Sequence, residues 1–192
     1  MDTGKNLLNT LKIISELFKK KNISFALAGG LAVGILSRPR ATEDIDLIIM
    51  ISDNDRQRIV NILSDEFKII NAHTEIMHFK NADIWRVIIA NEETSGNNIV
   101  IIDFIIAVND ICKNAIERRF FIEIDSIEIP IVTIEDLILL KLLSNRDIDR
   151  MDINYILKDS QKGDLNFIYL KDQINNNNLN IQAKDFFCKI LM

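Results

Sequence analysis

The 192-residue sequence contains little cysteine, proline or glycine: two Cys, two Pro and six Gly. Cys112 and Cys188 are too few and too far apart in the sequence for a disulfide framework or a zinc knuckle, so we expect two reduced thiols. The scarcity of proline and glycine excludes a fibrous segment and a Pro/Gly-rich linker. His73 and His78 stand without a carboxylate constellation, so a zinc site is not predicted either.

The sequence also lacks an excess of positive charge and a long apolar run. Lys and Arg number 23 against 28 Asp and Glu, a net charge of −5. This balance argues against broad, salt-driven coating of nucleic acid, although it leaves room for a local basic cleft. The most apolar stretch, residues 25–36, is far shorter than the roughly 20 residues of a membrane span. With no apolar leader segment at the N-terminus, we expect a cytoplasmic protein without a membrane partner.

The apolar residues that are present have the spacing of an α+β protein. Hydrophobic residues make up 48% and charged residues 27%, the balance of a globular chain. Apolar runs that alternate or are continuous predict strands, and spacing at i, i+3 and i+4 predicts helices. We expect strands at residues 24–28, 45–51, 67–70, 75–79, 84–90, 99–106, 120–124 and 127–132. We expect helices at residues 5–20, 31–36, 54–64, 108–118, 134–144, 147–158, 164–175 and 180–191.

Polar residues at the ends of these runs help to place the boundaries. Asp53 or Asn54 can cap the helix that ends near residue 64, and Thr133 followed by Asp136 resembles a capping box. Residues 91–98 have the polar, Gly-containing composition of a hairpin loop. The sequence therefore predicts a mixed β-sheet flanked by helices over residues 1–132. A C-terminal helical segment, residues 133–192, is expected to pack on that core.

Two aspartates stand at the start of the apolar strand expected at residues 45–51. Asp44 and Asp46 are separated by one residue, so their side chains point to the same face of a strand. Like charges a few ångströms apart repel, and the strand gains no stability from them. A divalent cation removes the repulsion, and Mg²⁺ prefers carboxylates together with substrate phosphates. Taken alone, such a pair is also common at a strand edge or in a turn.

A third aspartate, Asp103, lies inside the apolar run 99–106. An ionised group in a buried strand is unfavourable unless it is paired or binds a metal, and a backbone amide or an Arg is the alternative partner. If this strand lies beside residues 45–51, three carboxylates converge. Three carboxylates are sufficient ligands for two metal ions about 4 Å apart that clamp a phosphoryl displacement.

Gly29 and Gly30 separate a predicted strand from a predicted helix. Glycine allows a positive φ and a close approach of the backbone to a ligand. The amides at the start of the following helix would then attract phosphate. A simple tight turn is the alternative interpretation, because no dinucleotide-binding or P-loop pattern accompanies the two glycines.

Together these residues resemble the nucleotidyltransferase superfamily of the DNA polymerase β type. The resemblance rests on strand–Gly-Gly–helix, on a lone strand aspartate, and on alternate positions occupied by Arg40, Thr42, Asp44 and Asp46. It is closest to the minimal bacterial enzymes related to the AbiEii toxin. The resemblance extends into the helical segment. There Lys141 is followed at offsets of five, eight and eleven residues by Arg146, Asp149 and Asp152. The resemblance implies the nucleotidyltransferase fold, with residues 1–132 as its catalytic core.

The family resemblance implies a metal site. Asp44, Asp46 and Asp103 would be its ligands and the catalytic carboxylates, and Asp103 would also help to deprotonate the attacking hydroxyl. The implied cofactor is Mg²⁺, as two ions, with Mn²⁺ as a substitute.

The resemblance also implies a nucleotide site. Gly29 and Gly30 would hold the triphosphate of an NTP, although the superfamily often has Gly-Ser there and the serine contact is lost. Arg40 and Thr42 would contribute to the same site, and Lys141 would reach the phosphates from the first C-terminal helix.

Several of these charged residues also have a purely structural interpretation. Lys141 lies in the apolar run 137–143, where a cation needs an anionic partner or must extend to solvent. Arg40 could be a solvated loop residue. Arg146, Asp149 and Asp152 could pair with one another across adjacent helices, as a surface feature.

The sequence predicts an Mg²⁺-dependent enzyme that transfers a nucleoside monophosphate from an NTP to an acceptor hydroxyl. RNA, a small molecule and a protein remain as acceptors, so a toxin-like and an antibiotic-modifying enzyme are both open. A cognate antitoxin or another protein is a candidate partner. The alternative is a catalytically silent nucleotide-binding or regulatory module of a two-component system. A silent module usually loses a metal-binding acid, and this chain keeps all three.

Overall fold

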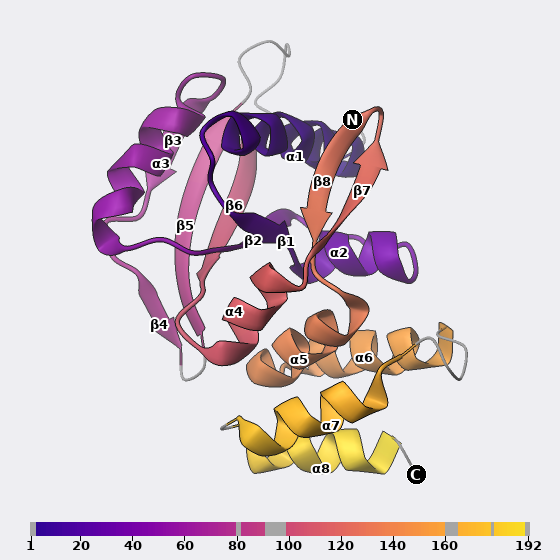
Figure 1. Cartoon of the computed structure of the whole chain (residues 1–192). Helices are drawn as coiled ribbons and strands as arrows, with labels where there is room; N and C mark the ends of the chain where they lie inside the picture. The colour runs from indigo at the N-terminus through magenta and orange to yellow at the C-terminus, as the bar shows by residue number, and fades with distance from the viewer. Residues whose placement is uncertain (1–2, 80–81, 91–98, 160–164, 178, 191–192) are drawn as a thin grey trace.

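The computed structural model describes residues 3–79, 82–90, 99–159, 165–177 and 179–190 (Figure 1). Its strands are β1 (Phe25–Leu27), β2 (Asp44–Ile49), β3 (Lys68–Ala72), β4 (Met77–Phe79), β5 (Ala82–Ala90), β6 (Ile99–Ile106), β7 (Phe120–Ile124) and β8 (Ile127–Ile131). Its α-helices are α1 (Thr3–Lys20), α2 (Gly29–Leu36), α3 (Arg56–Leu63), α4 (Asp110–Glu117), α5 (Ile134–Ser144), α6 (Asp147–Asp159), α7 (Phe167–Asn176) and α8 (Ile181–Ile190). The predicted hairpin loop at residues 91–98 lies outside the described residues.

The described strands form one mixed sheet in the order β3-β5-β6-β2-β1-β8-β7, and β4 pairs with β5. Most neighbours are antiparallel, but β2 runs parallel to β6 and β1 runs parallel to β8. The parallel pair β2–β6 joins strands that are more than 50 residues apart in the sequence, and its register places Asp46 opposite Asp103. The expected adjacency of these two strands is therefore confirmed.

The two faces of the sheet differ in chemistry because side chains alternate along each strand. Phe104 points away from Asp103 and stacks on Trp85 and on Phe18 of α1, with ring centroids 5.3 and 6.2 Å apart. Helix α1 thus covers the apolar face, and the carboxylates of β2 and β6 occupy the other. Phe79, Phe120 and Phe121 are exposed and lie outside this core.

Helices α5 to α8 lie on one side of the sheet in Figure 1, and α5 contacts α2, α4, α6, α7 and α8. The side chain of Thr133 caps α5 by accepting from the backbone N–H of Asp136, as the capping-box pattern predicted. The fully buried Asp136 carboxylate also accepts hydrogen bonds from Arg118, which caps the C-terminus of α4, and from Tyr169 of α7. One buried carboxylate thus joins three helices. The boundary of the predicted core at residue 132 stays a prediction.

Most element boundaries agree with the prediction to within a few residues. Helix α2 begins at Gly29 itself rather than after the two glycines. The predicted cap of α3 is wrong, because Asp53–Asp55 form a 3-10 turn and the Asp55 carboxylate accepts from Ser52 instead of capping the helix. Within the described residues, no helix is both long and apolar enough to cross a membrane.

Candidate active site

Asp44, Asp46 and Asp103 meet on the face of the sheet opposite α1. Each offers a carboxylate oxygen, and these oxygens all lie within 4.8 Å of one another. Asp44 and Asp46 are partly buried at the start of β2, and Asp103 is buried in the middle of β6, with 5% of its surface exposed. The structure therefore brings together the three predicted carboxylates. The parallel register of β2 and β6 is the reason, since it sets Asp46 and Asp103 side by side.

Asp44 and Asp46 receive hydrogen bonds from neutral groups. The Thr42 hydroxyl donates to Asp44 Oδ1 at 2.7 Å, and the backbone N–H of Gly30 hydrogen-bonds to the Asp46 carboxylate. Among the described residues, neither carboxylate has a basic side chain within ion-pair distance. Two negative charges are therefore held close together without a paired cation.

The crowding shows in the acidity of Asp46. Burial raises its pKa to about 7, and the neighbouring charges of Asp44 and Asp103 act in the same direction. The Gly30 hydrogen bond and the positive charge of Lys141 oppose this increase but do not outweigh it. Near neutral pH the cluster thus favours a bound proton or cation, as expected for a set of metal ligands.

The two glycines fit closely against the carboxylates. Gly29 has φ = +62°, and a Cβ at this position would lie 1.7 Å from Asp46 Oδ2. A Cβ at Gly30 would lie 2.1 Å from Nη1 of Arg40 and 2.7 Å from Oγ1 of Thr42. The first position needs glycine for its backbone conformation and for space, and the second for space. The turn thus brings the backbone up to the predicted site residues at β2.

Arg40 and Lys141 converge on a single buried carboxylate, Asp152 of α6. Lys141 Nζ lies 2.7 Å from Asp152 Oδ2, and Arg40 Nε lies 3.2 Å from the same oxygen. Lys141 is 5% exposed, so the alternative in which it extends to solvent is wrong. Arg40 is not a solvated loop residue either, because its side chain is 19% exposed and ion-paired. The role of both residues toward phosphate stays a prediction.

Asp149 is the second partner of Lys141, at 3.3 Å, and Arg146 contacts the same carboxylate at 2.8 Å. Burial disfavours the ionised form of Asp149, but hydrogen bonds from Arg146 and Ser144, together with the charges of Lys141 and Arg146, outweigh this effect and lower its pKa. Arg146 pairs with Asp149 as predicted, but Asp152 pairs with Lys141 and Arg40 instead. The predicted placement on the surface is wrong for the two acids, because Asp149 and Asp152 are each 1% exposed.

The loop that carries Arg40 and Thr42 is attached along one face of α6. Besides Arg40, the Ser37 hydroxyl donates to Asp159, and the guanidinium carbon of Arg38 lies 3.0 Å from the ring centroid of Tyr155. Asp152, Tyr155 and Asp159 are three and four residues apart, so they share a helix face. The helical segment therefore holds the loop that leads into Asp44 and Asp46.

Arg86 of β5 is a site residue that the sequence analysis missed. Its Nε and Nη2 donate to Oδ1 and Oδ2 of Asp103, both at 2.7 Å. The available signal was an Arg inside the apolar strand 84–90, on the face opposite Trp85 and Val87. Of the two alternatives left open for Asp103, a backbone amide or an Arg, the structure has the Arg.

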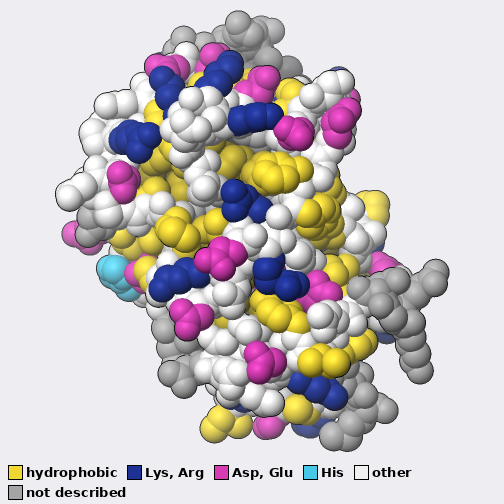
Figure 2. Space-filling model, viewed as in Figure 1, with side chains coloured by type: hydrophobic (Ala, Val, Ile, Leu, Met, Phe, Trp, Pro, Cys, Tyr) yellow, Lys and Arg dark blue, Asp and Glu magenta, His cyan; other side chains and the backbone are white. Residues whose placement is uncertain are grey.

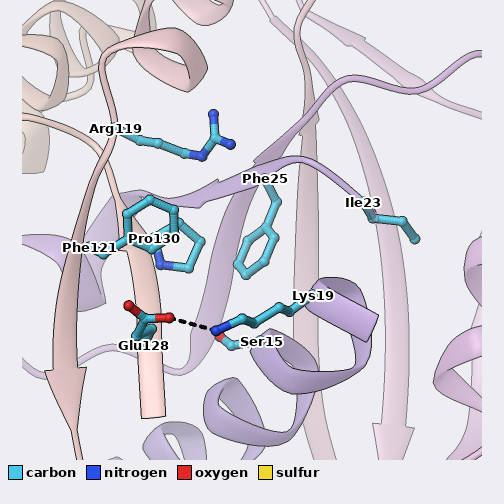
Figure 3. Close-up of a pocket in the computed structure, with 8 residues that line it drawn as sticks. All are labelled: Ser15, Lys19, Ile23, Phe25, Arg119, Phe121, Glu128 and Pro130. Carbon is cyan, nitrogen blue, oxygen red and sulfur yellow. Dashed lines mark hydrogen bonds and ion pairs between the residues drawn. The ribbon is translucent and has the colours of Figure 1, made fainter. Parts of the chain in front are cut away.

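A hollow of about 380 Å³ lies away from these residues, between α1 and the β7–β8 hairpin (Figure 3). Phe25, Phe121 and Pro130 line it, and the ion pair Lys19–Glu128 borders it. In the space-filling view, hydrophobic side chains gather in the middle of this side of the molecule, with Lys and Arg above them (Figure 2). None of the predicted site residues lines the hollow.

Solved structures share this fold across most of the chain. An antigenic nucleotidyltransferase-like protein from Paracoccidioides brasiliensis superposes with a TM-score of 0.58 at 19% identity, covering 90% of this chain and 87% of that chain. JHP933 from Helicobacter pylori superposes with a TM-score of 0.54 at 15% identity, covering 92% of this chain and 74% of that chain. The antibiotic-resistance factor ANT(2'')-Ia superposes with a TM-score of 0.52 at 13% identity, covering 91% of this chain and 93% of that chain. These likenesses confirm the nucleotidyltransferase fold.

The family comparison covers the carboxylates, the glycines and the lysine. No curated protein matches the chain in sequence. The family model described as "Nucleotidyl transferase AbiEii toxin, Type IV TA system" matches residues 13–172, most of the 192-residue chain. The chain therefore belongs to the AbiEii nucleotidyltransferase toxin family of type IV toxin–antitoxin systems, and it is a transferase enzyme of that family.

Proposed function

We propose that this enzyme transfers a nucleoside monophosphate from an NTP to an acceptor hydroxyl in a reaction that depends on Mg²⁺. The observation that carries the proposal is the carboxylate cluster. Three acidic side chains from two parallel neighbouring strands lie within 4.8 Å of one another, and two of them are without a basic partner among the described residues. Burial raises the pKa of Asp46 to about 7, and the charges of Asp44 and Asp103 act in the same direction.

The residues present fit a hard divalent cation. Asp44, Asp46 and Asp103 would hold it with carboxylate oxygens, the ligand type that Mg²⁺ and Mn²⁺ prefer. When bound, the cation would neutralise charge on the triphosphate and make the acceptor hydroxyl easier to deprotonate. Two such ions would be held by the three carboxylates together with the phosphates of the substrate.

The phosphate side of the site is assigned to the Gly29–Gly30 turn and to the cations beside it. The Gly30 N–H already donates to the Asp46 carboxylate, so the remaining backbone N–H groups at the start of α2 would bind the anion. Arg40 lies against Gly30, and the charge of Lys141 reaches Asp46. Lys141 uses two of its three N–H groups on Asp149 and Asp152, which leaves one for a phosphate oxygen.

The proposed reaction is an in-line displacement at the α-phosphorus. The acceptor oxygen forms a bond to that phosphorus, the bond to the oxygen that bridges the α- and β-phosphates breaks, and pyrophosphate leaves. The proton of the hydroxyl passes to a base, for which Asp103 is our candidate. Catalysis of this kind depends on positioning and charge neutralisation more than on covalent chemistry.

The acceptor hydroxyl belongs to an RNA, a small molecule or a protein. The toxin family favours a cellular macromolecule as the acceptor. The fold shared with an antibiotic-resistance factor is the reason to test a small molecule as well. Incubating the enzyme with each α-labelled NTP and a cell extract separates these classes, because the label moves to RNA, to protein or to a small product.

The metal-dependent activity itself is tested by pyrophosphate release with each NTP in Mg²⁺. Wild type is compared with the double variant Asp44→Asn/Asp46→Asn and with Asp125→Asn, a control that changes an exposed acid in the β7–β8 turn. We expect the double variant to lose at least about 100-fold in rate, because several kcal/mol of transition-state charge stabilisation would be lost. The control should retain the wild-type rate. Equal rates for all three proteins would contradict the proposal.

The same proteins distinguish the enzyme from a silent nucleotide-binding module. Millimolar Mg²⁺–NTP should raise the melting temperature of wild type, because binding to the native state stabilises it by mass action. A wild-type protein with a thermal shift but without pyrophosphate release, in the presence of cell extract, would be the silent module.

A further inference from the structure

Arg86, Asp103 and Asp46 form a row across three neighbouring strands. Arg86 of β5 is the register partner of Asp103 of β6, and Asp103 is the register partner of Asp46 of β2. Residues in register on adjacent strands point to the same face. The guanidinium therefore reaches the carboxylate cluster from the side of β5, away from the glycine turn and the helical segment.

The contact between Arg86 and Asp103 fixes the plane of the carboxylate. Two N–H groups of the planar guanidinium each hold one oxygen at 2.7 Å, the bidentate geometry that restricts a carboxylate most strongly. Lysine cannot reproduce this contact, because its ammonium is a point charge on a flexible stem. The Asp103 side chain is 8% exposed and that of Arg86 34%, so the pair is only partly screened by solvent.

The pairing leaves Asp103 able to bind a cation. A carboxylate oxygen has two lone pairs, and Arg86 occupies one on each oxygen. The lone pairs that remain belong to a group whose oxygen already lies within 4.8 Å of ligand oxygens of Asp44 and Asp46. Arg86 also offsets one of the three negative charges of the cluster.

From this geometry we propose that Arg86 is a positioning residue, which holds Asp103 in the orientation that shares a divalent cation with Asp44 and Asp46. The inference rests on the proposed metal-dependent function and deepens it. Two other roles predict different behaviour. If Arg86 only supplies positive charge, a lysine replaces it; if Arg86 competes with the cation, its removal tightens cation binding.

The test is Mn²⁺ binding by the full chain, measured from the paramagnetic resonance signal of the free ion. Arg86→Lys keeps the positive charge and removes the bidentate contact with Asp103. Arg58→Lys is the matched control, because Arg58 is exposed on α3 and its guanidinium contacts only the carbonyl of Lys21 among the contacts described for its side chain. We expect Arg86→Lys to bind Mn²⁺ at least about 10-fold more weakly than wild type, a typical effect of removing a group that orients a metal ligand. The control should be unchanged.

A double-mutant cycle shows whether Arg86 acts through Asp103. In an Asp103→Asn background, the further change Arg86→Lys should leave Mn²⁺ affinity unchanged, because the carboxylate that it orients is gone. Arg86→Gln serves as a second variant should the lysine variant unfold, since its neutral amide has a single donor nitrogen and cannot form the bidentate contact, and it should also bind Mn²⁺ more weakly.

Each outcome bears on the proposal. Wild-type affinity in Arg86→Lys would show that charge alone suffices, and tighter binding would show competition; either result overturns the positioning role. If wild type binds Mn²⁺ and only the Arg86 variants behave unexpectedly, the proposed function is unaffected. A wild type that binds no Mn²⁺ would overturn both proposals.

Discussion

The sheet and the helical segment both bury carboxylates, but they treat them differently. In the helical segment, Asp149 and Asp152 share Lys141, and Asp136 has Arg118. In the sheet, Asp103 has Arg86, whereas Asp44 and Asp46 receive only neutral hydrogen bonds among the contacts of the described residues. An ionised group is removed from water at a high cost unless it is paired. The fold thus supplies a basic partner for the helical acids and for Asp103, but not for Asp44 and Asp46.

This difference separates structural from functional charge. A paired carboxylate stabilises the native state once its partner is in place, and removing the partner leaves a buried charge without compensation. A cluster of unpaired carboxylates lowers the stability of the metal-free protein, and a bound cation restores that stability. Substitutions in the two regions should therefore have effects of opposite sign on stability.

The largest effect on stability is expected at Lys141. Lys141→Met leaves Asp149 and Asp152 buried without their shared cation, and we expect the free energy of unfolding to fall by about 3–5 kcal/mol. Urea denaturation followed by circular dichroism measures it. The control is Lys19→Met, which breaks an ion pair with side chains that are 70% and 56% exposed and should change stability by less than about 1 kcal/mol. Similar small losses in both variants would show that the buried cluster is not held by Lys141.

A smaller loss is expected at Gly29, where the turn meets the sheet acids. Gly29→Ala places a Cβ where Asp46 Oδ2 lies and forces a positive φ on alanine, which should destabilise the protein by about 2–3 kcal/mol. Gly34→Ala is the matched control in the same helix. Its Cβ would meet nothing closer than 3.9 Å, so the change should stabilise by about 0.5–1 kcal/mol through helix propensity. Thermal unfolding compares the two, and a destabilising Gly34→Ala would contradict this account of the helix.

The effect on stability at Asp46 has the opposite sign and depends on pH. The pKa of Asp46 is raised from 3.8 to about 7 in the folded protein, so between these values the folded state binds more protons than the unfolded state. Stability therefore falls as pH rises through this window, and the loss is complete above pH 7. Asp46→Asn cannot ionise and should be more stable than wild type by a few kcal/mol at pH 8 in metal-free buffer, with the difference gone near pH 4.

The direction of that difference is the informative result. Melting temperatures in EDTA, measured from pH 4 to pH 8, give it directly. A variant that is less stable than wild type at pH 8 would show that Asp46 is a paired, structural acid like Asp149.

Local patterns predicted the carboxylates well and their basic partners poorly. Asp44 and Asp46 stand out because alternation fixes their common face, and Asp103 stands out as a charge in an apolar strand. The contact between Arg86 and Asp103 depends on the register of β5 and β6, which the sequence does not fix when most residues on both faces of the two strands are apolar. An isolated Arg in such a strand was nevertheless a signal of the same kind as Asp103.

The helical segment shows a second limit of prediction from the sequence. Lys141, Asp149 and Asp152 have offsets of eight and eleven, but a helix break at Asn145, with φ = +51°, lies between the lysine and the acids. Their contacts depend on the angle between α5 and α6, which spacing along one helix does not give. The residues were identified, whereas their burial and the direct contact of Lys141 with both acids required the structure.

The most direct test of the central claim is a crystal structure with Mn²⁺ and a non-hydrolysable NTP, with diffraction recorded at the manganese absorption edge. We predict an anomalous peak within about 2.3 Å of carboxylate oxygens of Asp44, Asp46 and Asp103. Lys141 should still lie between Asp149 and Asp152. A nucleotide bound without any such peak at the three carboxylates would contradict the account.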